Sequence, residues 1–211
     1  MADGDFAAMR AAMVASQLRT SDVNDPAVIA AMAQVPREEF VPAARRDTAY
    51  TDRSIPLGSG AAMNPPLATG RLLNAAGIQP GDKVLLLGDA TGYTAALLMH
   101  IGASVTAVGS GQKPATLPGS VKWVDGAPAK GCKSSGPYDV LVIDGAVAEF
   151  PDALTGQLAE KGRVVTGMSE RGVTRLCSGR KAGGVVGFVR LADMEMVDAI
   201  GFEPAPAGFT F

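Results

Sequence analysis

The sequence has few of the residues that build metal centres and disulfide frameworks. Its 211 residues include two cysteines and one histidine. Cys132 and Cys177 lie far apart without a CxxC spacing, and His100 has no second histidine with which to complete a metal site. We therefore expect no zinc site and no disulfide bond.

The sequence also lacks a strong excess of one charge and a long apolar run. Its formal net charge is −2, which gives no broad positive field for nucleic acid. No stretch approaches the roughly 18 apolar residues of a membrane-spanning helix. The start, MADGDFAAMR, lacks the basic and apolar regions of a signal peptide. These absences favour a cytoplasmic protein that binds a small molecule or another protein, with neither nucleic acid nor membrane as a partner.

One internal segment lacks acidic side chains, because none occurs between Asp89 and Asp125. The segment falls where a nucleoside-binding α/β fold places the carboxylate that binds the ribose. Just before it, residues 83–93 (KVLLLGDATGY) show a buried strand, a glycine turn and a helix start, the local architecture of a cofactor crevice. The sequence thus predicts a crevice with the backbone shape of a nucleoside-binding fold but without some of the polar groups that such a fold normally has.

The apolar residues that are present suffice for one domain. A hydrophobic content of 47% with 19% charged residues suits a single domain over residues 1–211. The organisation changes near residue 80. We expect residues 1–80 to form a helical cap and a substrate-side loop, and residues 81–211 to form a cofactor-binding sheet and a C-terminal hairpin.

Hydrophobic periodicity predicts helices in the first part and alternating strands and helices in the second. This alternation is typical of a Rossmann-like α/β fold with a mostly parallel sheet and helices on both faces. A turn at Gly183-Gly184 predicts an antiparallel hairpin at the sheet edge. The expected helices are 6–18, 26–35, 67–76, 93–101 and 151–159, and the expected strands are 83–87, 104–108, 138–143, 163–166, 174–177 and 185–191.

Ligands of such sheets bind beyond the carboxyl ends of the strands. Residues 88–92, 109–111, 125–126 and 144–145 should therefore line one crevice. Gly88 and Gly92 would let the backbone approach a ligand, and the N-terminus of the following helix would offer N–H donors to an anion. The alternative is a plain strand-to-helix turn in which Asp89 caps the helix. The short motif does not decide between the two.

Several segments resemble the protein-L-isoaspartate O-methyltransferase family over nearly the whole chain. They are MVASQLRTSDVNDPAVIAAMAQVPREEFVP, AYTDRSIPLGSG, the glycine turn, GPYDVLVIDGAV and QLAEKGRVV. The first is the most specific, because QLR, VPRE and FVP at this spacing are not general features of nucleotide folds. The resemblance implies a methyltransferase fold with S-adenosylmethionine as cofactor. It also implies methylation of the isoaspartyl carboxylate in damaged proteins or peptides, which starts their repair.

The resemblance and the strand ends together give the candidate site residues. Asn64 is the candidate catalytic residue, since its amide stands where the family has a hydroxyl ahead of a proline. Asp144 also has a plain alternative as a strand-end residue that caps the next loop. The candidate cofactor-binding residues are Gly88, Asp89, Ala90, Thr91, Gly92, Gly109, Asp125, Gly126 and Asp144.

Three of the cofactor positions depart from the family pattern. Leu86 replaces an acid, Ala90 replaces a glycine, and Gly109 replaces the acid that binds the ribose hydroxyls. A hydrogen bond to a charged group contributes roughly 1.5–3 kcal/mol, so losing the ribose acid should weaken cofactor binding by about tenfold to a hundredfold.

Two functions stay open after these departures. One is a methyltransferase with weak cofactor binding or a shifted carboxylate substrate. The other is a non-catalytic relative that keeps the fold as a binding or regulatory module, having lost the cofactor. A dinucleotide oxidoreductase is less favoured, because its ribose would need the same missing acid.

A few other side chains were candidates for function and have simpler explanations. His100 suits the negative end of a helix dipole, and Trp123 and Met99 are expected to pack in the interior. A basic cluster near the hairpin is a candidate for docking an acidic partner, although charges beside a hairpin are usually just solvated. The cluster consists of Arg171, Arg175, Arg180 and Lys181.

Overall fold

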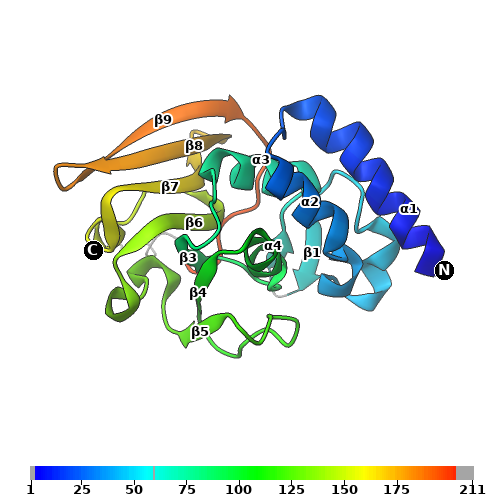
Figure 1. The fold of residues 1–211 in the computed structure, drawn as a ribbon, viewed down its shortest axis with the longest axis horizontal. Coiled ribbons are helices and arrows are strands. Elements are labelled where there is room, and N and C mark those ends of the chain that lie inside the picture. The colour runs from blue at the N-terminus through cyan, green and yellow to red at the C-terminus, as the bar shows by residue number, and fades with distance from the viewer. Residues whose placement is uncertain (1–2, 59, 203–211) are drawn as a thin grey trace, which may run out of the picture.

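A computed structural model describes residues 3–58 and 60–202, and its centre is a seven-stranded sheet (Figure 1). The strand order is β5-β4-β3-β6-β7-β8-β9. The strands from β5 to β7 in this order are parallel, and β7, β8 and β9 pair antiparallel. This arrangement confirms the predicted mostly parallel α/β fold with an antiparallel hairpin at the sheet edge. The strands are β3 (Lys83–Leu87), β4 (Ser104–Gly109), β5 (Lys122–Asp125), β6 (Tyr138–Val147), β7 (Leu158–Glu170), β8 (Val173–Ala182) and β9 (Val185–Asp193).

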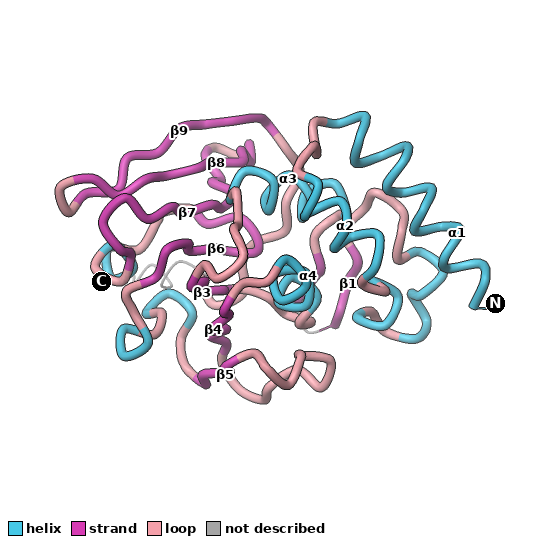
Figure 2. Tube along the Cα trace, viewed as in Figure 1, coloured by secondary structure: helices cyan, strands magenta, loops and turns pink. Residues whose placement is uncertain are grey.

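The N-terminal helices lie together beside the sheet, as Figure 2 shows. Asp25 caps α2 by accepting hydrogen bonds from the backbone N–H of Ala27 and Val28, and Pro26 follows at the first helical position. Gly77, with φ +56°, ends α3. The helices here are α1 (Asp3–Met13), continued by a π-helical turn (Val14–Leu18), α2 (Pro26–Gln34) and α3 (Pro66–Ala76), with 3₁₀ turns at Arg19–Ser21, Arg37–Phe40 and Ala43–Thr48.

Helices cover the two faces of the sheet unequally. On one face, α3 and α4 (Tyr93–Ile101) pack against the sheet and α2 packs against both of them, enclosing Leu86 and Val142. On the other face, the short helix α5 (Asp152–Thr155) contributes Leu154 to a second apolar cluster. The 3₁₀ turns Pro128–Lys130 and Lys133–Ser135 lie on the chain between β5 and β6.

The predicted helix over 151–159 is wrong beyond Thr155. Leu158 pairs with Tyr138 in a parallel ladder, and its side chain is 2% exposed within the second cluster. Burial of this side chain and pairing of its backbone with β6 therefore prevail over helical spacing. The structure also contains strands that the sequence did not predict: the four-residue β5, and a hairpin of β1 (Ile55–Gly58) and β2 (Ala61–Met63) in the proline-rich and glycine-rich stretch.

Arg163 of β7 joins the C-terminal end of α3 to the sheet. Its guanidinium donates hydrogen bonds to the carbonyl oxygens of Ala76 (2.9 Å) and Gly77 (3.2 Å) and forms an ion pair with Asp82 (2.7 Å). We expect Arg163→Met to lower the free energy of unfolding by about 1–2 kcal/mol, because it removes hydrogen bonds to two helix-end carbonyl groups and the ion pair with Asp82. Urea unfolding measures the change. Arg171→Met, at the exposed β7–β8 turn, is the matched control, and an equal loss in both variants would contradict this role.

Candidate functional site

A cavity of about 300 Å³ lies at the carboxyl ends of β3, β4 and β5. It brings together residues of the glycine turn, the end of β4 and the β1–β2 hairpin, which covers it from the N-terminal part of the chain. Four predicted cofactor residues line it, namely Gly88, Asp89, Ala90 and Gly109. Ser110 also lines it, within the segment 109–111 that the sequence places at the crevice. The remaining lining residues, which the sequence does not single out as ligand contacts, are Leu57, Gly58, Ala61, Val108, Gln112, Pro114, Trp123, Pro128 and Ile200.

The other predicted site residues surround this cavity without lining it. Thr91 and Gly92 are buried at the start of α4. Gly92 has φ +85°, and a Cβ atom there would lie 2.9 Å from the Cα atom of Leu117, so this position requires glycine. Asp125 is exposed at the end of β5, where it accepts a hydrogen bond from the backbone N–H of Gly111 at 2.9 Å.

Asp89 caps helix α4 from within the glycine turn. Its carboxylate accepts hydrogen bonds from the backbone N–H groups of Thr91 (3.1 Å), Gly92 (2.8 Å) and Ala95 (2.9 Å). The Thr91 hydroxyl accepts a further one from the backbone of Tyr93 at 3.2 Å. The structure thus contradicts the expectation that these donors are open to an anion, and it bears out the alternative in which Asp89 caps the helix.

Asp89 and Asp144 form a pair of enclosed carboxyl groups next to the cavity. Burial, followed by the charge of Asp144, raises the pKa of Asp89 to about 6. Burial also raises the pKa of Asp144, while hydrogen bonds from Thr94 (2.7 Å) and Asn64 (2.9 Å) and the charge of Arg37 act to lower it. The site therefore carries negative charge close to the expected ligand position.

Asn64 is buried and joins three parts of the chain. Its amide nitrogen donates to Asp144, and its amide oxygen accepts from the backbone N–H of Val197 at 2.9 Å. Its backbone carbonyl accepts from the buried guanidinium of Arg37. The side chain is only 2% exposed and does not line the cavity. These contacts give Asn64 a role in holding Asp144, and its catalytic role stays a prediction.

Trp123 occupies the space in front of Gly109. A Cβ atom on Gly109 would lie 2.4 Å from the Cη2 atom of the Trp123 ring. Gly109 pairs with Asp125 on β5, and Trp123 precedes Asp125 by two residues, so both β5 side chains share one face of the sheet. The ring therefore occupies the space into which a side chain at position 109 would project. Trp123 was expected to pack in the interior, and it is also a wall of the cavity.

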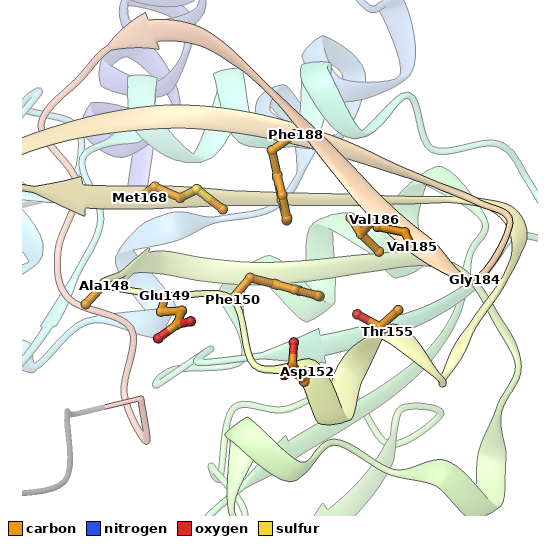
Figure 3. Close-up of a pocket in the computed structure, with 10 residues that line it drawn as sticks. All are labelled: Ala148, Glu149, Phe150, Asp152, Thr155, Met168, Gly184, Val185, Val186 and Phe188. Carbon is orange, nitrogen blue, oxygen red and sulfur yellow. The ribbon is translucent and has the colours of Figure 1, made fainter.

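A second hollow of about 620 Å³ lies on the face of the sheet that carries α5 (Figure 3). Phe150 and Phe188 meet there edge to face, with ring centroids 5.2 Å apart. None of the predicted site residues lines it, so it is not the candidate site. It is lined by Ala148, Glu149, Phe150, Asp152, Thr155, Met168, Gly184, Val185, Val186 and Phe188.

Two members of the basic cluster make contacts within the sheet. Arg175 pairs with Asp193 at 3.0 Å and with Glu170 at 3.8 Å. Lys181 donates to the backbone carbonyl of Leu158 at 2.8 Å. Within the described ranges, no group of three or more histidine, cysteine or acidic residues could hold a metal ion, and no helix is long and apolar enough to cross a membrane.

Comparison with solved structures identifies the fold. A protein-L-isoaspartate O-methyltransferase superposes with a TM-score of 0.76 at 22% sequence identity, covering 90% of this chain and 65% of that one. A Plasmodium falciparum protein described as a putative protein-L-isoaspartate O-methyltransferase, solved in complex with S-adenosyl-L-homocysteine, has a TM-score of 0.72 at 17% identity. The match covers 93% of this chain and 98% of the other.

Related sequences also match this chain over nearly its whole length. Protein-L-isoaspartate O-methyltransferase of Koribacter versatilis is 37% identical over 95% of this chain and 96% of its own. Protein-L-isoaspartate O-methyltransferase 1 of Rhodopseudomonas palustris (strain HaA2) is 35% identical over 94% and 85%, respectively. The family model for protein-L-isoaspartate(D-aspartate) O-methyltransferase matches residues 9–199. The chain therefore belongs to the protein-L-isoaspartate(D-aspartate) O-methyltransferase family.

Proposed function

We propose that this protein transfers the methyl group of S-adenosylmethionine to the isoaspartyl carboxylate of damaged proteins. The observation that carries the proposal is the cavity at the carboxyl ends of β3, β4 and β5, built on the Gly88 turn in a chain of this family. Relatives that carry the isoaspartate methyltransferase name match along nearly the whole chain. Cytoplasmic location stays a prediction from the sequence.

The size of the cavity and the residues that line it suit an adenosyl ligand. The volume lies at the lower end of the range of small-molecule sites, roughly 300–1,000 Å³. Gly88 has φ +80° and no side chain, so its backbone can approach a ligand closely. Trp123 and Val108 offer apolar surfaces, and the Ser110 hydroxyl and Gln112 amide offer neutral polar groups. These neutral groups would replace the missing acid at position 109.

The proposed chemistry requires little from the protein. The bound cofactor supplies an electrophilic methyl group, and an ionised carboxylate is already a nucleophile. The chain then has to hold the two groups in line and exclude water. The β1–β2 hairpin contributes Leu57 and Ala61 to the cavity wall, so it is placed to exclude water and to border the approaching protein substrate.

A second candidate function is a non-catalytic module that binds without methyl transfer. Two observations favour it: the Trp123 ring fills the place of the ribose acid, and Leu86 is 0% exposed within the apolar core. Neither position therefore offers an acid to the ribose. The two candidates make different predictions for binding and for turnover.

Binding and transfer assays on the full chain separate these functions. We expect saturable calorimetric binding of S-adenosylmethionine, with an affinity about tenfold to a hundredfold lower than an intact ribose acid would give. We also expect methylation of an isoaspartyl peptide and none of the matched aspartyl peptide. Binding without transfer would favour the non-catalytic module. Absence of binding up to millimolar ligand would contradict the methyltransferase.

A further inference from the structure

The wall of the cavity carries a single kind of charge. Of the described residues that line it, Asp89 is the only one with an ionisable side chain. Its carboxylate is held in place by three backbone N–H groups, two in the glycine turn and one in the first turn of α4. The cavity therefore has a fixed anion where a helix N-terminus would otherwise offer positive potential to a ligand.

The neighbouring charges do not cancel this anion. Asp144 is the acid next to Asp89, and its two carboxylate oxygens accept hydrogen bonds from Asn64 and Thr94. The charge of Arg37 acts on Asp144 from the buried side of the site. Arg37 thus offsets part of the charge of Asp144, and Asp89 is the acid that lines the cavity itself.

We propose that Asp89 makes this crevice selective for a positively charged adenosyl ligand, so that it binds the sulfonium S-adenosylmethionine more tightly than the neutral thioether S-adenosylhomocysteine. The inference rests on the proposed function, since it needs an adenosyl ligand in the cavity. A fixed carboxylate in an enclosed site attracts a sulfonium cation more strongly than it would in water. The ligand's own carboxylate gains little here, because Asp89 already accepts from the N–H groups of Thr91, Gly92 and Ala95.

A third ligand separates the effect of the sulfonium charge from the effect of the ligand's carboxylate. Decarboxylated S-adenosylmethionine keeps the sulfonium group and lacks the carboxylate. If α4 has no donors for a ligand carboxylate, this compound should bind at least as tightly as S-adenosylmethionine itself. The expected order of affinity is decarboxylated S-adenosylmethionine, then S-adenosylmethionine, then S-adenosylhomocysteine.

Calorimetry at pH 7.5 on the full chain measures the three affinities. We expect S-adenosylmethionine to bind about tenfold more tightly than S-adenosylhomocysteine, and Asp89→Asn to reduce this ratio to about one. The variant keeps one of the two side-chain oxygens that accept from the backbone N–H groups of Thr91, Gly92 and Ala95. Asp152→Asn, an exposed acid on the other face of the sheet, is the matched control and should keep the wild-type ratio.

A pH series on the wild-type chain tests the same inference without a substitution. The pKa of Asp89 is about 6, so its charge is present above this pH and is lost below it. The affinity for S-adenosylmethionine should therefore fall as the pH is lowered through about 6, while that for S-adenosylhomocysteine changes little. Asp144 and Arg37 are the other charged groups that face this site, and the same pH series on Asp89→Asn separates their effect on the cation from that of Asp89.

The possible results separate the inference from the function on which it rests. Equal affinities of the two ligands in the wild-type chain, or a tenfold ratio that persists in Asp89→Asn, would overturn the inference and leave the methyltransferase in place. Decarboxylated S-adenosylmethionine binding more weakly than S-adenosylmethionine would show that the crevice does bind the carboxylate, against the inference. If no adenosyl ligand binds at millimolar concentration, both proposals fail.

Discussion

Replacing Arg37 by Met is expected to lower the free energy of unfolding by about 3–5 kcal/mol. Arg37 is 0% exposed, and its guanidinium donates to the carbonyl oxygens of Ala49 (2.7 Å) and Asn64. Its charge also acts on the enclosed Asp144 carboxylate. The substitution keeps most of the volume and leaves two carbonyl groups and one buried carboxylate without a positive partner. Urea unfolding at pH 7.5 measures the loss.

Two further variants show whether the loss comes from these contacts. Arg46→Met removes a guanidinium from the exposed 3₁₀ turn Ala43–Thr48 and should change stability by at most about 0.5 kcal/mol. Adding Asp144→Asn to Arg37→Met removes the unpaired charge and should recover about 1 kcal/mol. If Arg37→Met costs no more than Arg46→Met, the buried guanidinium does not hold Asn64 and Asp144 in place.

Local chemistry made the outline of this fold predictable. Asp25 followed by Pro26 predicts the start of α2, and Gly183-Gly184 predicts the turn between β8 and β9, because each depends on neighbouring residues alone. The structure has these features where the sequence predicts them. Asp89 is an intermediate case: a cap and an anion site were both consistent with the glycine turn, and only the hydrogen bonds of its carboxylate decide between them.

The contacts that shape the site join distant residues, so periodicity could not predict them. Asn64 and Asp144 are 80 residues apart and become partners through the packing of the N-terminal cap on β6. The contact of Trp123 with Gly109 depends on which strands are adjacent and in which register. One signal was present in the sequence. Trp123 and Asp125 are two residues apart, so their side chains lie on the same face of a strand. Gly109, at the end of the neighbouring strand, leaves room there for a large ring.

Restoring the ribose acid should require two substitutions together. We expect Gly109→Glu combined with Trp123→Ala to bind S-adenosylhomocysteine about tenfold to a hundredfold more tightly than Trp123→Ala alone. The new carboxylate would accept hydrogen bonds from the ribose hydroxyls, once the ring no longer fills the space in front of it. Gly109→Glu alone should gain little, because its Cβ atom would meet the Trp123 ring at 2.4 Å. Calorimetry measures all three variants.

A control ligand ties the gain to the sugar. The 2′-deoxy analogue of S-adenosylhomocysteine lacks one of the hydroxyls, so it should lose most of the gain in the double variant and little in Trp123→Ala. An acid at position 86 would not serve the same purpose, because Leu86 is fully buried between Ala107 and Val142 of the neighbouring strands. A carboxylate there would be buried in the core without a partner. If the double variant binds no better than Trp123→Ala, the missing acid at position 109 does not limit the affinity, and another group must already bind the ribose.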